Sequence, residues 1–336
     1  MRRFLAVVSL LLASAALAGP VNISPEEHDR QARVLDQLKK AVAAETSDAA
    51  KLAIIARLMK EEKAVDLRGQ ALELATQIPG ADLDAFLTAL LGNEPDAGLR
   101  SRAAAALGHL GSEKCLPALA ECAANDRTTD VEIGCIRGRS SARRAATFAV
   151  AELAARHPKI ADDAAAKLRA LSPVGDGKEK AGLADARVQA LYQITHDDVL
   201  LKPFFERLKS KDGEARVQGI VAFRFLKLKK APPEVVAALD DASPDVASWA
   251  ALVLGEIGDP KTAPPLMAIA ADAKKEVGLR CNAIGALGSM KVADASDLME
   301  RLLTDDDQRV VVNAAIALHR ITGKKVKQFP EGYRDD

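Results

Sequence analysis

One pattern of residues recurs eight times between residues 68 and 318, and this recurrence constrains the fold more than any other feature of the sequence. Each copy is aligned on an anchor position; the anchors are Arg68, Arg100, Arg143, Arg187, Arg216, Ala247, Arg280 and Val311. Successive anchors are 32, 43, 44, 29, 31, 33 and 31 residues apart. Repeats of about 20–50 residues are typical of solenoids, in which similar units stack one on the next.

Three columns of this alignment hold only small or apolar residues. Three places after the anchor every residue is Ala or Gly, and one place before it and seven places after it every residue is apolar. These offsets are four residues apart, so they form one stripe along a helix. A small residue in the stripe lets helices approach closely. The small column is Ala71, Ala103, Ala146, Ala190, Gly219, Ala250, Ala283 and Ala314. We expect it to be buried, with no strand between its members.

Boundary residues predict that each repeat is a helix, a turn and a second helix. Polar side chains before the anchors are expected to be N-caps: Asp66, Asp96, Asp185, Asp212, Ser243 or Asp245, and Asp307. Glycines after them are expected to end the helices in left-handed caps: Gly108, Gly111, Gly255, Gly258, Gly288 and Gly323. Prolines are expected to open the first helix of the next unit: Pro117, Pro233 and Pro264.

Two of the repeated phrases, residues 98–111 and 243–260, resemble HEAT repeats, in the short form also found in phycobilisome lyases. The resemblance covers roughly residues 45–323 and weakens at Gln193 and at His319, which stands where the family has glycine. It implies an all-α fold, a right-handed α-solenoid (an armadillo/HEAT-like superhelix) of about eight helix-pair repeats. The second helices would line a concave surface. The family uses this scaffold for many unrelated tasks.

The ends of the chain have their own character. Residues 1–18 are typical of a signal peptide: Arg2 and Arg3 precede an apolar run that ends in Ala16-Leu17-Ala18. We expect cleavage after Ala18 and export to the periplasm or the extracellular space. Residues 19–44 form a lead-in with a helix from a Ser24 cap to Ala44, residues 45–323 the repeats, and residues 324–336 a polar tail that frays. The two long intervals place loops at 125–141 and 172–185.

Composition and motifs argue against several classes of function. The 47 basic and 47 acidic residues balance, and aromatic residues are only 3% of the chain. We therefore expect no nucleic-acid partner, since that needs a basic surface and stacking platforms. The mature chain has no segment that would span a membrane. The five histidines lack metal-pair spacing and no catalytic motif is present, so we expect no enzyme activity, metal ion or cofactor. A lyase-like or other enzyme is a minor alternative.

The loop at 125–141 holds two further candidates. Cys122 and Cys135 flank it and are the best candidates for a disulfide in an exported protein; the alternative is that the four cysteines are small apolar fillers. Arg137, Arg139 and Arg144 are a candidate contact for an anion or an acidic partner. The alternative for these arginines, which the pattern favours, is a solvated loop of mixed charge.

The anchor arginines recur at one structural position, so we expect them to form a ladder that binds aspartates or carbonyl groups of the turns. Two other columns, two and nine places after the anchor, lie off the buried stripe and would line the concave face. The candidate partner-binding residues are Arg102, His109, Gln189, Gln218, Trp249, Asn282 and Asn313. Trp249, the sole Trp, is the natural anchor because Trp is enriched among binding hot spots. Alternatively, Trp249 is a partly buried packing residue.

These patterns predict an exported scaffold that binds a protein or peptide partner along its concave face, without chemistry. The alternative from another class is a structural or accessory subunit of an envelope assembly, attached by its ends or its loops. The sequence does not indicate the oligomeric state.

Overall fold

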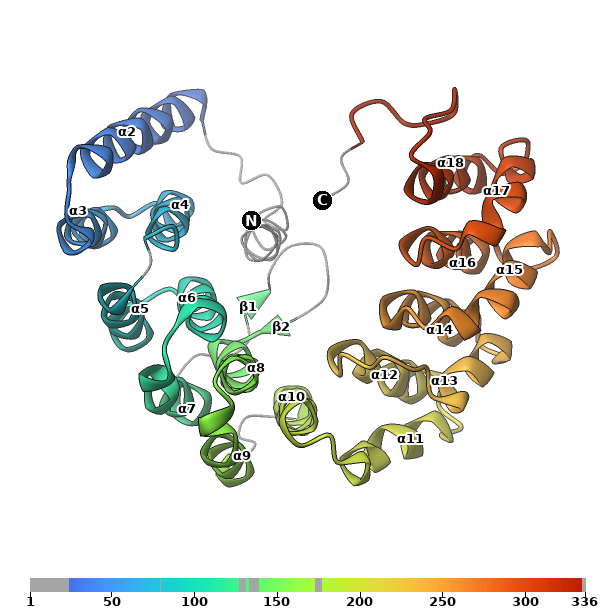
Figure 1. Cartoon of the computed structure of the whole chain (residues 1–336), viewed down its shortest axis with the longest axis horizontal. Helices are drawn as coiled ribbons and strands as arrows, with labels where there is room; N and C mark the ends of the chain where they lie inside the picture. The colour runs from blue at the N-terminus through green and yellow to red at the C-terminus, as the bar shows by residue number, and fades with distance from the viewer. Residues whose placement is uncertain (1–23, 79, 127–130, 133–138, 173–176, 334–336) are drawn as a thin grey trace. The chain divides into compact units, whose positions relative to one another are not determined.

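The computed structural model describes residues 24–78, 80–126, 131–132, 139–172 and 177–333 (Figure 1). Contacts divide the chain after His196 into two compact units, and each is described by itself below. The predicted signal peptide lies outside the described residues. Over the described ranges, no helix combines the length and apolar character needed to cross a membrane.

The first unit consists of a lead-in helix and four helix pairs in two rows (Figure 1). The lead-in is α2 (Pro25–Ala44), and Ser24 caps it as predicted: its Oγ accepts the Glu27 N–H at 3.2 Å. The row of first helices is α3 (Asp48–Glu61), α5 (Ala81–Asn93), α7 (Leu116–Asn125) and α9 (Ala161–Ala170). The row of second helices is α4 (Val65–Ala75), α6 (Ala97–Leu110), α8 (Ala142–Arg156) and α10 (Gly177–Thr195).

The second unit consists of four more helix pairs in the same two-row arrangement (Figure 1). The first helices are α11 (Lys202–Leu208), α13 (Pro233–Ala237), α15 (Ala263–Ala271) and α17 (Ser296–Leu302). The second helices are α12 (Gly213–Ala222), α14 (Pro244–Ile257), α16 (Val277–Ser289) and α18 (Gln308–Thr322). Single 3-10 turns flank the helices of both units: η1 (Glu113–Cys115), η2 (Pro158–Ile160), η3 (Asp198–Leu201), η4 (Phe223–Phe225), η5 (Ala238–Asp240), η6 (Pro260–Thr262) and η7 (Ala293–Ala295).

The chain is an all-α solenoid, with eight helix pairs in its described part. One strand pair interrupts the helices, between α7 and α8: β1 (Val131–Glu132) runs antiparallel to β2 (Arg139–Ser140), with Val131 opposite Ser140. The expectation of no strand between the small-column residues is wrong at this loop. The pair spans two residues on each side and leaves the helices on either side of it intact, so it decorates the connection and does not alter the stack.

The small column lies in the interior, as the repeat pattern predicts. Ala71, Ala103, Ala146, Ala190, Ala250, Ala283 and Ala314 are each 0% exposed, and Gly219 is buried. At Gly219 an added Cβ would come 2.9 Å from Leu208 and 3.2 Å from the Phe204 carbonyl oxygen, both in the first helix of the same pair. The column therefore sets the close contact between the two helices of one repeat.

A second set of small residues sets the contact between repeats. Gly108 of α6 faces Ala149 of α8, and a Cβ on Gly108 would lie 2.8 Å from the Ala149 Cα. The same contact recurs between later pairs of second helices. A Cβ on Gly255 would lie 2.6 Å from the Ala286 Cβ and 2.7 Å from its Cα, and a Cβ on Gly288 would lie 2.8 Å from both the Cα and the Cβ of Ala317. The backbones of neighbouring second helices thus touch at these points.

This contact corrects the interpretation of the glycines. Gly108, Gly255 and Gly288 lie inside their helices and do not end them. Gly258 and Gly323 are left-handed caps, as predicted, with φ of 72° and 77°. Gly111 ends α6, but with an extended backbone (φ −64°, ψ 157°). The two kinds of glycine differ in their offset from the anchor: the internal glycines lie eight places after it, and the glycines that end helices lie eleven or twelve places after it.

Most other boundary predictions are confirmed, with three exceptions. Asp96, Asp212 and Asp307 cap their helices by accepting backbone N–H groups, and Pro117, Pro233 and Pro264 open first helices. Asp66 lies inside the first turn of α4, and Asp185 lies within α10, because that helix already begins at Gly177. Much of the loop expected at 172–185 is therefore helix, which suits its run of Lys, Glu and Ala. The described part of the tail, residues 324–333, folds back on α18, in contrast to the frayed tail that was expected.

We expect Gly288→Ala to destabilise the chain by about 1–3 kcal/mol, because the new methyl group overlaps the α18 backbone. Gly285 on the same helix is the matched control, since a Cβ there meets no heavy atom within 4 Å. Gly285→Ala should stabilise the chain by about 0.5–1 kcal/mol through helix propensity. Urea unfolding measures both. Equal effects of the two substitutions would contradict the proposed contact.

Candidate partner-binding face

The anchor arginines form the predicted ladder, and it fixes the edge of each repeat. In four repeats the guanidinium binds a carboxylate 25 or 26 residues later, just after the first helix of the next repeat. The pairs are Arg68–Glu94, Arg100–Asp126, Arg216–Asp241 and Arg280–Asp305. In two repeats it binds a carbonyl: Arg143 donates to Asp126 O (2.6 Å) and Arg187 to Leu171 O (2.7 Å).

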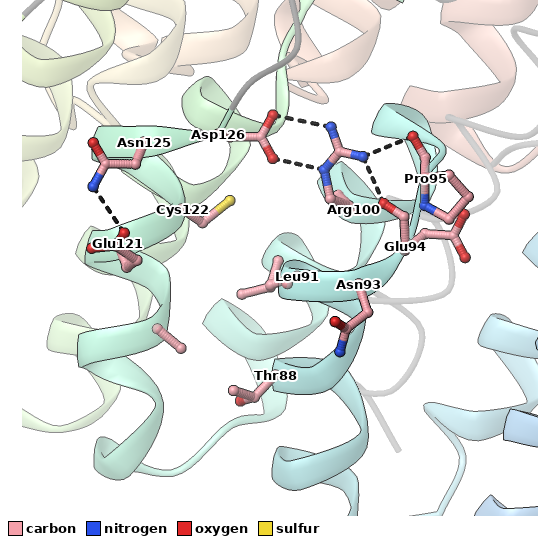
Figure 2. Close-up of a pocket in the computed structure, with 12 residues that line it drawn as sticks. Thr88, Leu91, Asn93, Glu94, Pro95, Arg100, Glu121, Cys122, Asn125 and Asp126 are labelled. Carbon is pink, nitrogen blue, oxygen red and sulfur yellow. Dashed lines mark hydrogen bonds and ion pairs between the residues drawn. The ribbon is translucent and has the colours of Figure 1, made fainter.

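Arg100 shows how one rung is built (Figure 2). Its Nε and Nη2 donate to the two oxygens of Asp126 at 2.7 and 3.1 Å. Its Nη1 donates to the carbonyl groups of Glu94 and Pro95 at 2.7 and 2.9 Å. The guanidinium therefore ties the turn of its own repeat to the turn of the next. Arg100 and Asp126 are 8% and 9% exposed, so this pair is shielded from solvent.

An open pocket of about 710 Å³ lies beside this rung, between the C-terminal ends of α5 and α7 (Figure 2). Its polar side chains bind within the protein: Asn125 donates to Glu121 Oε1 (2.8 Å) and Asn93 to Ala89 O (3.0 Å). The Arg100 guanidinium already makes four bonds to protein oxygens. The pocket is thus the outer surface of a structural rung.

Two rungs of the second unit perturb the ionisation of their carboxylates. The Arg216 guanidinium holds the pKa of Asp241 below its ordinary value, with help from the Ser243 N–H. Arg280 does the same for the pKa of Asp305, which also accepts the Asp307 N–H. In both cases hydrogen bonds to the ionised form outweigh partial burial, which acts in the opposite direction.

Four candidate residues lie at one repeat position on consecutive second helices of the second unit: Gln218 on α12, Trp249 on α14, Asn282 on α16 and Asn313 on α18. We call these four residues the amide–Trp row. Gln218 is exposed and the other three are half-buried. Asn282 Nδ2 donates to Ser248 O of α14 at 3.1 Å, so this amide also ties α16 to its neighbour. Asn313 Nδ2 donates within α18, to Arg309 O at 2.8 Å.

Trp249 is the centre of a small cation–aromatic cluster. The guanidinium of Arg224 lies 5.7 Å from its ring and 5.9 Å from the ring of Phe225. Glu256 of α14 accepts two bonds from Arg224, at 2.8 and 2.6 Å, and holds it there. The indole keeps part of its surface in solvent, and the ring quadrupole attracts the neighbouring guanidinium.

The three candidates of the first unit differ in environment. Arg102 lies over Gly69 of α4, so close that a Cβ there would come 2.5 Å from Nη1. His109 Nδ1 lies 3.6 Å from Glu152 Oε1 on the next second helix. Gln189 is 1% exposed. The structure therefore places Gln189 inside the packing interface of α10, where it cannot touch a partner.

The loop candidates are described in part. Arg137 and Cys135 lie outside the described residues, so the anion contact at Arg137 and the Cys122–Cys135 disulfide stay predictions. Arg139 pairs with Glu132 through the backbone, and its side chain is outside the described part. The Arg144 guanidinium lies 5.8 Å from the Phe148 ring. The Cys122 side chain is buried, and its Sγ lies 3.8 Å from Ala142 O.

Sequence reasoning did not identify the carboxylates that pair with the ladder arginines, nor the arginine beside Trp249. Glu94, Asp126, Asp241 and Asp305 lie about 25 residues from their arginines, and a second repeat column drawn at that offset would have found them. Arg224 stands eight places after its anchor, one place before the outer of the two polar columns. Its pairing with Glu256 depends on a 3-10 turn that no propensity indicates. Within the described ranges, no three His, Cys, Asp or Glu side chains gather closely enough to hold a metal ion.

The comparisons with known proteins concern the repeats. HEAT repeats match residues 51–138 and 201–278. No curated protein matches the sequence. Human deoxyhypusine hydroxylase is similar in structure at 15% identity and a TM-score of 0.36, over 82% of this chain and 98% of that one. E. coli YibA is similar at 17% identity and a TM-score of 0.43, over 90% of this chain and 99% of that one. The CpcE–CpcF complex of phycocyanin lyase from Nostoc sp. PCC7120 is similar at 18% identity and a TM-score of 0.40, over 80% of this chain and 94% of that one.

We expect Asp241→Asn with Asp305→Asn to weaken the chain at neutral pH and to flatten its acid sensitivity. A carboxylate whose folded pKa is lowered contributes stability above its unfolded pKa of about 3.9, and that contribution is lost as the pH falls through the folded value. Urea midpoints between about pH 7 and pH 2 measure this. Asp294→Asn, at an exposed position, is the control. Parallel curves for the native and doubly substituted chains would refute the assignment.

Proposed function

Since the chain is a HEAT-repeat protein, we propose that it is a scaffold that binds a protein or peptide partner on its second-helix face and performs no chemistry. The observation that carries this proposal is the amide–Trp row. It presents three amides and one half-exposed Trp from four consecutive helices. A solenoid holds such a row at fixed spacing because each repeat packs on its neighbours.

The chemistry of the row suits a polypeptide partner. An amide group has two N–H donors and an acceptor oxygen, which complement the N–H and C=O groups of a peptide chain. The bonds described for Asn282 and Asn313 each use one side-chain N–H to fix the amide. An amide fixed in this way loses little conformational entropy on binding. Trp249, steadied by Arg224, supplies an apolar contact of the kind that dominates binding energy.

The thiols support a role without nucleophilic chemistry. Burial raises the pKa of Cys115 to about 11 and that of Cys122 to about 12, and it also raises the pKa of Cys281. The thiolate is the reactive form of cysteine, so these groups stay protonated and unreactive near neutral pH. The ladder arginines likewise bind protein oxygens. Among the described residues, the cysteines and the ladder arginines therefore suit weak contacts better than catalysis.

We propose further that the chain works outside the cytoplasm, in the periplasm or the extracellular space. The support is the basic start, apolar run and A-x-A ending of residues 1–18.

Loss of Trp249 and Asn282 should abolish partner capture and leave the fold intact. We expect Trp249→Ala to weaken binding about 30-fold, as for a hot-spot side chain worth about 2 kcal/mol, and Asn282→Ala to weaken it less. The partner is first isolated from the exported fraction with the immobilised chain and identified by mass spectrometry. Affinities are then measured with the purified partner, beside circular dichroism of each variant.

Arg301→Ala is the control for that experiment, because Arg301 is exposed on the first-helix row. It should leave affinity unchanged. Native affinity in the Trp249 and Asn282 variants would refute binding at this face. That result would favour the alternative, an accessory subunit of an envelope assembly held by its ends or loops.

The mature chain should begin at Gly19 when the full sequence is expressed in a bacterium with an intact secretion pathway. Intact mass of the protein recovered from the periplasm or the medium gives the cleavage point. Replacing Arg2, Arg3 and the apolar run's Leu10–Leu12 with acidic and polar residues should retain the full-length chain in the cytoplasm. A native chain that keeps residues 1–18 and stays in the cytoplasm would refute export.

A further inference from the structure

The tail after α18 is packed against the last repeat. Gly323 ends α18 in a left-handed cap, and the chain then turns back. The Phe329 ring meets the His319 ring of α18 edge-on at 4.9 Å, and the Tyr333 ring meets Phe329 at 5.3 Å. Two short backbone turns shape the segment: Phe329 N–H donates to Val326 O (3.0 Å) and Tyr333 N–H to Pro330 O (3.4 Å).

His319 occupies an informative position in the repeat. Gly255 and Gly288 stand eight places after their anchors and receive the alanine of the next second helix. In the last repeat that position is His319, and no further helix follows in the described chain. An imidazole fills the space that glycine leaves open, and it presents a flat ring. Phe329 of the tail covers this ring, where the next helix would otherwise pack.

A second row of contacts leads to the same place. Arg224 binds Glu256, which joins η4 to α14, and Arg320 Nη1 donates to Ser289 Oγ at 3.3 Å, which joins α18 to α16. Arg320 also donates through Nη2 to the Tyr333 hydroxyl, at 2.7 Å, with its guanidinium 5.9 Å from that ring. The hydroxyl of Tyr333 thus takes the role that a side chain of the next repeat would take.

We infer that residues 324–333 are a built-in cap, which stands in for a ninth second helix and closes the C-terminal end of the array to a second copy of this chain. The cap turns its aromatic residues toward α18, and its outer residues Lys324, Lys325, Lys327 and Glu331 are exposed. Lys325 also lies 5.0 Å from the Phe329 ring. A charged outer surface offers no apolar stripe on which another repeat could stack. The inference is independent of partner binding on the amide–Trp row.

The test uses the full chain with single substitutions. Phe329→Ala should release the tail, so that trypsin cleaves after Lys324, Lys325 and Lys327 about tenfold faster than in the native chain, because cleavage follows the population of the open form. The same variant should self-associate as its concentration rises, as light scattering after gel filtration measures, whereas the native chain stays monomeric. Glu331→Gln, at an exposed position, is the matched control and should change neither result.

Tyr333→Phe is the milder variant, because it removes only the hydroxyl that binds Arg320. It should speed cleavage severalfold, and circular dichroism should show native helix content. Cleavage at native rates in both variants would overturn the cap. Faster cleavage with an unchanged monomer would overturn the closure against a second copy. Affinity for the partner of the amide–Trp row should be native in both variants, which separates this test from that of the proposed function.

Discussion

Backbone contact between neighbouring second helices is the constraint on which the rest of the structure depends. At Gly108, Gly255 and Gly288 a helix has no side chain, and an alanine of the next helix fills the gap. Larger residues would hold the helices apart, because interaxial distance follows the size of the side chains at the contact. Close contact aligns the buried stripe of one repeat with that of the next, and a continuous core results.

The arginine ladder adds orientation to this packing. A glycine–alanine contact fixes how near two helices lie, and a planar guanidinium with its donors in a fixed fork fixes how the turns meet at their edge. Arg68–Glu94, Arg100–Asp126 and Arg280–Asp305 are largely buried, and breaking such a pair leaves an uncompensated charge. The anchor at α14 is Ala247, so this rung is absent there, and the joint with the next pair is held by the glycine contact at Gly255 and the hydrogen bond from Asn282 to Ser248 O.

The sequence was sufficient to predict the helix pairs, the buried small column and the arginine ladder, because the first two recur in all eight copies and the ladder arginine recurs in six. It was not sufficient for features that depend on one partner. Gly288 was expected to end its helix but lies inside α16, and the position of Ala317 explains why the residue is glycine. Gln189 belongs to the polar column yet is buried, because the packing around α10 encloses it.

The candidate face shows the same division. Trp249, Asn282 and Asn313 fall on one row as the columns predict, since that row follows from helical periodicity. Arg224 and Tyr333 come from a 3-10 turn and a tail, and no repeat column contains them. Local periodicity therefore predicts which side chains share a face, and tertiary contacts decide which of them is held in place.

The glycine contacts also set the spacing between side chains of the amide–Trp row. The side chains at Trp249, Asn282 and Asn313 are separated by the interval between helix axes, and Gly255 and Gly288 set that interval without touching the face themselves. Widening one of these contacts by a methyl group would shift every side chain of the row beyond it, although the three residues themselves would be unchanged. The spacing of the amide–Trp row is therefore determined by residues that do not belong to the row.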